Sequence, residues 1–194
     1  MKYLLKLFLF LTPFVLLSQE HELSIFENLV GKTWKAEGNW GDGSKFFQEI
    51  DVRYSMDKSI VVLESIGFID KDQTQIGLRN HGIRQYDSAS KSIRFWEYDV
   101  FGGLTKGTVS SIGNDIMYQY SYAETFVTDY WTYVNDSTYN LKIGVFENGE
   151  WKQTFSNVVF KAKNISEMDQ MYSTLKNKLI GNWSSKAWDG VLML

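Results

Sequence analysis

The sequence predicts an all-β protein, an antiparallel up-and-down barrel of about 8–10 strands followed by a C-terminal helix. Three observations predict this fold class. Residues 33–163 are rich in aromatic and β-branched residues, and turn residues divide the stretch at regular intervals. No stripe of apolar residues at helical spacing appears before Lys163. A Gly-Trp phrase opens the stretch, as Gly31 to Trp34, and returns after it, as Gly181 to Trp183.

The turn residues define the number of strands. Nine candidate turns lie at 40–43, 55–57, 70–72, 87–90, 101–103, 111–114, 123–124, 135–137 and 148–149. Nine turns imply about ten strands, at the spacing of an antiparallel meander. Asn148-Gly149 is the clearest signal, because both central positions of a type I′ turn need a positive φ, which Asn and Gly tolerate best.

The strands alternate in a way that favours closure. Tyr118, Tyr120 and Tyr122 share one strand face, and Arg94, Trp96 and Tyr98 share a face opposite Ile93, Phe95 and Glu97. Residues 59–69 are apolar on both faces, so that strand has few positions suited to water. An open sheet of about ten strands would expose two edges, and closing it into a barrel removes them. We therefore expect a barrel over 24–163 rather than a sandwich.

The N-terminus has the order of an export signal. Lys2 and Lys6 precede an apolar run over 7–17, and Ser18 is a small residue at a plausible cleavage point. The run is short for a bilayer span, so we expect cleavage after Ser18 and no stable membrane span afterwards. A retained membrane anchor is the alternative. The prediction is an exported protein, periplasmic or extracellular.

The C-terminal segment carries two further expectations. Met168, Met171, Leu175 and Leu179 recur at helical spacing, which predicts an amphipathic helix over 164–180 that packs on the barrel. Residues 181–194 then repeat the barrel-opening phrase. They are interpreted either as a strand that closes this domain or as the start of a second repeat, and the helix-Gly-Trp order favours a tandem domain missing after residue 194.

Composition excludes several classes of function. Removing residues 1–18 leaves 176 residues and takes the formal net charge from −3 to −5, which gives no support for nucleic-acid binding. The chain has no cysteine, so disulfides, thiolate metal sites and a cysteine nucleophile are excluded. With only His21 and His81, no metal-binding cluster is visible, and no cofactor is expected.

The opening phrase resembles a known family. A short helix followed by Gly31 and Trp34 at the first strand, repeated as Gly181 and Trp183, resembles the calycin superfamily of lipocalins and fatty-acid-binding proteins. Residues 29–38, together with 82–87, Phe95-Trp96, Gly103 and Gly107, are similar to bacterial lipocalin-like domains of unknown function. The resemblance implies that the tryptophan plugs one end of the barrel and that the glycine lets the entering helix approach closely. It also implies a small apolar or amphipathic ligand.

The barrel also resembles haem-binding nitrobindins, which place an axial histidine near the barrel's C-terminal end. Nothing matches that histidine here, because the last third of the chain has no His or Cys. Haem iron needs an axial donor, so no haem is expected. We interpret His81 as a residue at the end of a strand.

The candidate ligand-binding residues are one carboxylate, two arginines and the aromatic residues near them. They are Glu64, Arg84, Arg94, Trp96, Tyr98, Tyr118 and Tyr120. By the resemblance to fatty-acid-binding proteins, Arg84 or Arg94 holds an acidic head group inside the barrel. The alternative is a Glu–Arg pair or surface charges, because alternation alone does not say which face is inside.

Catalysis has little support in the sequence. A Ser-His-Asp triad would depend on His81 alone, and no nucleophile-elbow, phosphate-loop or dinucleotide motif occurs. The carboxylate pairs Glu49/Asp51 and Glu97/Asp99 are expected on a solvated outer face. The first hypothesis is thus a non-enzymatic barrel that binds a small apolar or amphipathic molecule. The alternatives are a filled barrel that acts through its surface as an accessory module and, last, an enzyme active in the barrel mouth.

Overall fold

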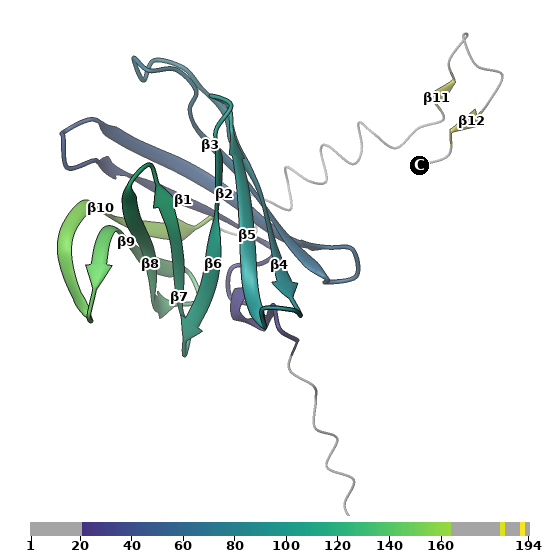
Figure 1. The fold of residues 1–194 in the computed structure, drawn as a ribbon. Coiled ribbons are helices and arrows are strands. Elements are labelled where there is room, and N and C mark those ends of the chain that lie inside the picture. The colour runs from purple at the N-terminus through teal and green to yellow at the C-terminus, as the bar shows by residue number, and fades with distance from the viewer. Residues whose placement is uncertain (1–20, 164–182, 185–190, 193–194) are drawn as a thin grey trace, which may run out of the picture.

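The structure is a computed structural model, and it describes residues 21–163, 183–184 and 191–192. Ten strands form one closed antiparallel barrel (Figure 1). Their bounds are β1 Lys32–Asn39, β2 Lys45–Ser55, β3 Ile60–Phe68, β4 Ile76–Asp87, β5 Ser92–Asp99, β6 Leu104–Ile112, β7 Asp115–Tyr122, β8 Thr125–Asn135, β9 Thr138–Glu147 and β10 Glu150–Ala162.

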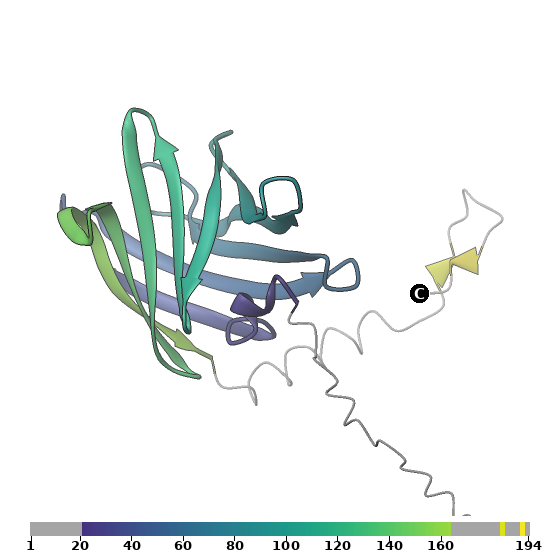
Figure 2. The same ribbon diagram turned by 60° about the horizontal axis from the view of Figure 1, so that its bottom comes forward.

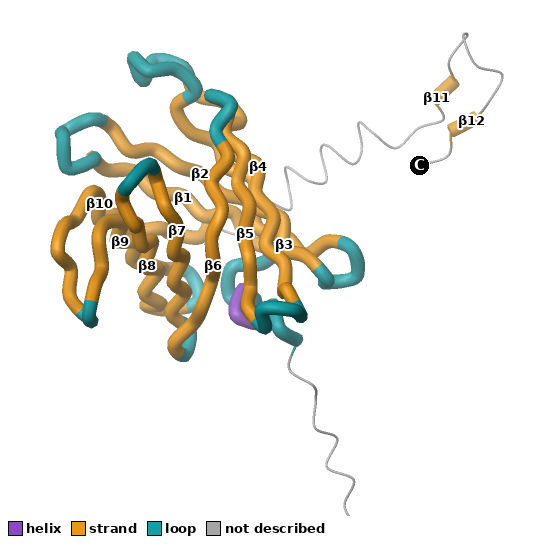
Figure 3. Tube along the Cα trace, in the orientation of Figure 1, coloured by secondary structure: helices purple, strands orange, loops and turns teal. Residues whose placement is uncertain are grey.

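The topology is a simple meander. Each strand pairs with the strands before and after it in sequence, and β10 returns to pair with β1. The nine connections are short, as the loops between the orange strands in Figure 3 show. The predicted all-β class, the closed barrel and the count of about ten strands are confirmed. The predicted signal over 1–18 and the predicted helix over 164–180 lie outside the described residues.

The turn between β9 and β10 has the predicted backbone. Asn148 and Gly149 have φ values of 52° and 80°, and they join the paired residues Glu147 and Glu150. Two consecutive positive φ values give the twist that matches the flanking strands. The type I′ turn is therefore confirmed.

One end of the barrel is closed by the segment that precedes β1. A single 3-10 turn, η1 Ser24–Phe26, lies at this end (Figure 2), and Leu23, Phe26 and Leu29 are buried there. Trp34 is fully buried, and its indole Nε1 donates a hydrogen bond to the Leu29 carbonyl at 3.0 Å. The indole therefore packs under the closing segment.

Gly31 has a different role from the one the resemblance implies. A Cβ at this position would meet nothing within 4 Å, so no close approach requires glycine. Its φ is +75°, in the left-handed region that glycine adopts without steric cost. Its N–H donates to the Val52 carbonyl at 2.8 Å. The glycine is needed to turn the chain into β1.

The core nearest the closed end is aromatic. The Trp34 ring meets Tyr139 edge-on at 5.3 Å, and Trp131 lies 4.6 Å from Phe160 between ring centroids. Trp34, Tyr139 and Phe160 are all 0% exposed. Such aromatic pairs add to the burial energy, so this half of the barrel is a packed core.

The seam between β1 and β10 is the weakest junction of the barrel. Paired residues are Trp34 with Ala162 and Lys35 with Lys161, and an isolated bridge follows between Trp40 and Ser156. Between these points the ladder is interrupted. A surface hollow lies along this seam and is lined by residues 35–37, 159 and 161–163.

The last described residues form a separate pair of strands. β11 Trp183–Ser184 pairs with β12 Val191–Leu192 in a two-stranded antiparallel sheet. In this structure β11 therefore pairs with β12, and the barrel closes through β1 and β10.

Candidate functional site

Polar side chains gather on the inner wall of the barrel, by which we mean the strand positions that face its interior. The inner positions of β3 are Val61, Leu63 and Ser65, all buried. In register they lie beside Arg84, Gly82 and Asn80 of β4, so these three also face inward. The inner positions of β5 end in Glu97, because Ile93 and Phe95 on the same face are buried. We call Asn80, Arg84, Glu97, Tyr118, Tyr120 and Asp129 the inner polar cluster.

Arg84 is the centre of this cluster. Its side chain is 3% exposed, and its Nη2 lies 2.7 Å from the Glu97 Oε2. Its Nε donates to the Tyr118 hydroxyl at 3.2 Å, and its guanidinium stacks 5.2 Å from the Tyr118 ring centroid. The amide Nδ2 of Asn80 donates to the other Glu97 oxygen at 2.9 Å. A buried charge pair with these additional bonds satisfies most of the polar atoms it removes from water.

Two glycines make room for this arrangement. A Cβ on Gly82 would collide with the Arg84 Nη1 and lie 3.0 Å from the Glu97 Oε2. A Cβ on Gly107 would lie 2.9 Å from both Phe95 and Tyr120, and closer still to the Gln119 carbonyl. Arg84 can reach Glu97 diagonally because the residue that Glu97 faces in register, Gly82, has no side chain. The cluster therefore depends on glycine at these two positions.

A second carboxyl group faces the same interior. The Tyr120 hydroxyl donates to Asp129 Oδ1 at 3.0 Å, and Asp129 lies opposite Tyr118 in the β7–β8 register. Burial raises the pKa of Asp129 to about 7, and the Glu97 charge acts in the same direction. Burial also raises the pKa of the Tyr118 and Tyr120 hydroxyls. The cluster thus places the Arg84 guanidinium next to Glu97 and near a second carboxyl group whose pKa is raised.

Three polar atoms on this wall have no hydrogen-bond partner in the described part of the chain. They are the Arg84 Nη1, the Asn80 Oδ1 and the Ser65 Oγ, and all three are buried. Asn80 and Ser65 face each other in register across β3 and β4, and Arg84 lies on the same face of β4. Buried polar atoms are almost always paired, so an unpaired group calls for an explanation.

The interior beside the cluster is occupied by side chains. The Arg79 stem fills the space beside Gly67, and the Val158 side chain fills the space beside Gly38. Arg79 donates to the Phe68 carbonyl and stacks on Phe101 at 5.2 Å. The space above Gly82 is filled by the flexible end of Arg84 itself. A molecule that binds here would have to move the Arg79 side chain.

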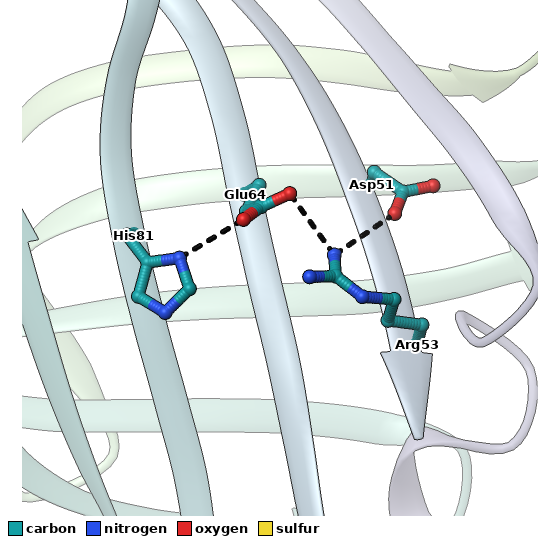
Figure 4. A network of polar contacts seen from close by, with 4 residues as sticks. All are labelled: Asp51, Arg53, Glu64 and His81. Carbon is teal, nitrogen blue, oxygen red and sulfur yellow. Dashed lines mark hydrogen bonds and ion pairs between the residues drawn. The ribbon is translucent and has the colours of Figure 1, made fainter. Parts of the chain in front are cut away.

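Of the residues proposed from sequence, Arg84, Tyr118 and Tyr120 come together in the cluster, and Glu64 lies elsewhere. It is on the outer face, where its carboxylate lies 3.0 Å from Arg53 and 3.0 Å from His81 Nδ1 (Figure 4). Arg53 also reaches Asp51 at 3.4 Å. The hydrogen bond from Arg53 and that from His81 lower the pKa of Glu64. Glu64 is therefore a surface charge on the outer face, and its arginine partner is Arg53 rather than Arg84 or Arg94.

Arg94, Trp96 and Tyr98 also lie on the outer face. Tyr98 is 52% exposed, and Arg94 and Trp96 line a surface hollow together with residues 85–88. This corrects the expectation that the 94–98 strand turns these side chains inward. The opposite face of β5, with Ile93 and Phe95, is the buried one, because it meets the aromatic core.

Sequence reasoning missed three members of the cluster. Glu97 was expected on a solvated face, whereas its side chain is 20% exposed and pairs with Arg84. Asn80 and Asp129 gave no signal of their own. Gly82 and Gly107, two glycines in the interiors of predicted strands, were the available signal, because a strand glycine often marks close approach by another group.

Other kinds of site lack support in the described residues. Within residues 21–163, no group of His, Asp and Glu side chains is arranged to hold a metal ion. No helix of the described chain is long and apolar enough to cross a membrane.

The fold and the cluster define a closed antiparallel barrel with a buried polar site on its inner wall. The sequence matches no model of a protein family and no curated protein. The resemblance to calycins therefore stays a resemblance, carried by the short motifs.

Proposed function

We propose that this protein binds a small amphipathic molecule on the inner wall of its barrel. The polar group of the ligand would meet the Arg84 Nη1, the Asn80 Oδ1 and the Ser65 Oγ. Its apolar part would lie along inner apolar side chains such as Leu63 and Phe95, which flank these atoms in register. Displacement of the Arg79 side chain would open the way from the loop end, opposite the end that η1 closes.

One observation carries this proposal. A buried ion pair contributes little net stability, and a barrel of this size could fill the same space with apolar side chains. Here the Arg84–Glu97 pair is instead kept in the inner wall, with unpaired donors and acceptors beside it. Those groups are the ones a ligand could satisfy, and satisfying a buried donor or acceptor is worth about 1–3 kcal/mol.

The test is binding of a neutral fluorescent probe, Nile red, to the purified protein. We expect Arg84→Met to weaken probe binding or its displacement by amphiphiles at least about tenfold, which corresponds to about 1.4 kcal/mol. Arg94→Met is the matched control, since Arg94 lies on the outer face, and it should leave binding unchanged. Equal behaviour of the two variants, or no binding by the parent protein, would contradict the proposal.

A second candidate function is an accessory module that acts through its surface. Its support is an outer apolar patch formed by Ile66, Ile76, Leu78, Tyr98 and Leu104, which are 39–60% exposed. Ile66 pairs with Leu78 and Tyr98 with Leu104 in register, so the patch crosses β3 to β6. Exposed apolar patches of this kind often bind other proteins. If Leu78→Lys removes biological activity and Arg84→Met does not, the surface is the functional element.

Export is proposed on the sequence of residues 1–18 alone. The charged, apolar and small-residue order predicts cleavage after Ser18. N-terminal sequencing of the protein recovered outside the cytoplasm should begin within two residues of Gln19, and retention of Met1 would contradict it.

A further inference from the structure

We propose that the inner polar cluster selects an uncharged polar head group, such as an amide or alcohol, over a carboxylate anion. This inference rests on the proposed function, since it assumes that a ligand binds on the inner wall. It concerns the chemical class of that ligand. It reverses the expectation, implied by the resemblance to fatty-acid-binding proteins, that Arg84 holds an acidic head group.

The first argument is charge. The Arg84 guanidinium already has an anionic partner, Glu97, at 2.7 Å, and Asn80 holds that carboxylate in place. Asp129 adds a second carboxyl group opposite Tyr118. The cluster therefore has no positive charge left over. An incoming carboxylate would meet like charges in a poorly hydrated site, where such repulsion is strong.

The guanidinium of Arg79, the other arginine of β4 whose stem lies in the interior, does not change this balance. Arg79 is engaged with the Phe68 carbonyl and the Phe101 ring, towards the loop end of the barrel. Arg79 has no register partner on β3, because the register shifts by one residue between Ser65 and Ile66. It therefore does not belong to the alternating series of inward-facing residues Asn80, Gly82 and Arg84. The Arg79 guanidinium therefore lies towards the loops, and the ion pair of Glu97 is with Arg84.

The second argument is hydrogen bonding. The unpaired atoms include a donor, Arg84 Nη1, an acceptor, Asn80 Oδ1, and a hydroxyl that can do either, Ser65 Oγ. The orientation of the Asn80 amide follows from its contact with Glu97, because only the NH₂ group can donate to a carboxylate. A carboxylate only accepts, so it would leave the Asn80 oxygen unpaired. An amide or a hydroxyl donates and accepts, and it satisfies both sides.

The third argument is that the cluster is held in shape before a ligand arrives. Arg84 is fixed by Glu97, by Tyr118 and by its stacking on Phe95 at 5.7 Å. Gly82 leaves the space that this course of the side chain occupies. A preorganised site pays less entropy on binding, and it also resists the rearrangement by which Arg84 could leave Glu97 for a ligand anion.

The experiment compares two probes with the same twelve-carbon chain, lauramide and laurate, by displacement of Nile red at pH 8. We expect lauramide to bind at least tenfold more tightly than laurate. Glu97→Gln removes the competing carboxylate, so laurate affinity should rise at least tenfold while lauramide affinity changes less than threefold. Glu64→Gln is the matched control, because Glu64 pairs with an arginine on the outer face and should leave both affinities unchanged.

The outcomes separate this inference from the proposed function. If laurate binds the parent protein as tightly as lauramide or more tightly, the inference is wrong and interior binding stands. If neither probe binds and Nile red does not bind, the proposed function fails. Should Glu97→Gln not fold, as judged by circular dichroism, the comparison of the two probes on the parent protein still decides the inference.

Discussion

The Arg84 side chain occupies the place where residue 82 would have a Cβ, and this relationship between Arg84 and Gly82 sets the shape of the inner polar cluster. Arg84 and Glu97 are not direct partners across β4 and β5. Glu97 faces Gly82 in register, and Arg84 faces Phe95. The ion pair is therefore a diagonal contact across a missing side chain. The Arg84–Glu97 pair thus depends on glycine at position 82, a residue that strand interiors ordinarily disfavour.

Gly82→Ala should consequently destabilise the barrel and disturb the ion pair. The added methyl group collides with the guanidinium, so we expect a loss of about 1–3 kcal/mol in the free energy of unfolding, as for overpacked cores. Gly77→Ala is the control on the same strand, where the nearest atom is the end of the Ile69 side chain at 3.0 Å. It should cost less than about 1 kcal/mol. Urea unfolding of both variants measures the difference, and equal losses would show that Arg84 adapts freely.

Asp129 should make the barrel less stable as the pH rises. Its pKa in the folded protein is about 7, whereas an unfolded Asp has a pKa near 4. The folded state therefore holds a proton that the unfolded state loses over this range, and the slope of stability against pH is negative. The contribution is fully present below about pH 4 and is lost as the pH rises through about 7.

Asp129→Asn removes this titration. The stability difference between the parent protein and the variant, measured by urea unfolding at pH 5 and at pH 8, should shift in favour of the variant at pH 8. The Tyr120 hydroxyl can still donate to the amide oxygen, so the local hydrogen bond survives. Parallel pH profiles for the two proteins would mean that Asp129 does not titrate in this range.

Trp34 should be the most sensitive residue at the closed end. Trp34→Phe removes the bond from Nε1 to the Leu29 carbonyl and leaves space beside Tyr139. An unpaired buried acceptor and a small void together predict a loss of about 2 kcal/mol. Trp96→Phe, on the outer wall, should cost less than about 0.5 kcal/mol. Thermal unfolding should then show a fall in Tm for Trp34→Phe alone, and an unchanged Tm would mean that η1 does not depend on the indole.

The fold was predictable because its signals are local. Asn148-Gly149 demands a hairpin wherever it lies between two strands, and the other turns use the same residue types. Alternation then sets the strand period within each segment. None of these signals requires knowledge of which strands meet, since a meander pairs each strand with its neighbour in sequence.

The cluster was only partly predictable, because a period of two defines two faces and does not say which is inside. Arg84 and Arg94 are equivalent by that criterion. Their difference arises from neighbours across the sheet: Arg84 lies beside buried Val61, and Arg94 beside exposed Gln85. The extra residue Arg79 in β4 also shifts the register, and no local pattern announces such a bulge.

The two glutamate–arginine pairs should differ sharply in their effect on stability. Glu97→Gln leaves the buried Arg84 charge without its anion, and breaking a buried pair typically costs about 3–5 kcal/mol. Glu64→Gln acts on the exposed pair with Arg53, and exposed pairs are worth less than about 1 kcal/mol. Denaturant midpoints of the two variants at pH 7 give the comparison. A small loss for Glu97→Gln would indicate that solvent reaches Arg84.

The seam between β1 and β10 should exchange its amide protons faster than the rest of the barrel. The Lys163 N–H donates to the Thr33 carbonyl, so Thr33 and Lys163 form a hydrogen-bonded pair. Such pairs alternate along an antiparallel ladder, so the next two in this register are Lys35 with Lys161 and Glu37 with Val159. The ladder includes the first of these pairs and stops before the second.

Hydrogen exchange measured by NMR should therefore show rapid exchange at Glu37 and Val159 and strong protection at Lys35 and Lys161. The comparison lies within the same two strands, which controls for position in the barrel. The physical reason is local opening, because an amide without a strand partner exchanges without unfolding of the core. Equal protection at all four amides would mean that the seam is closed in solution, and the barrel would then have no weak junction.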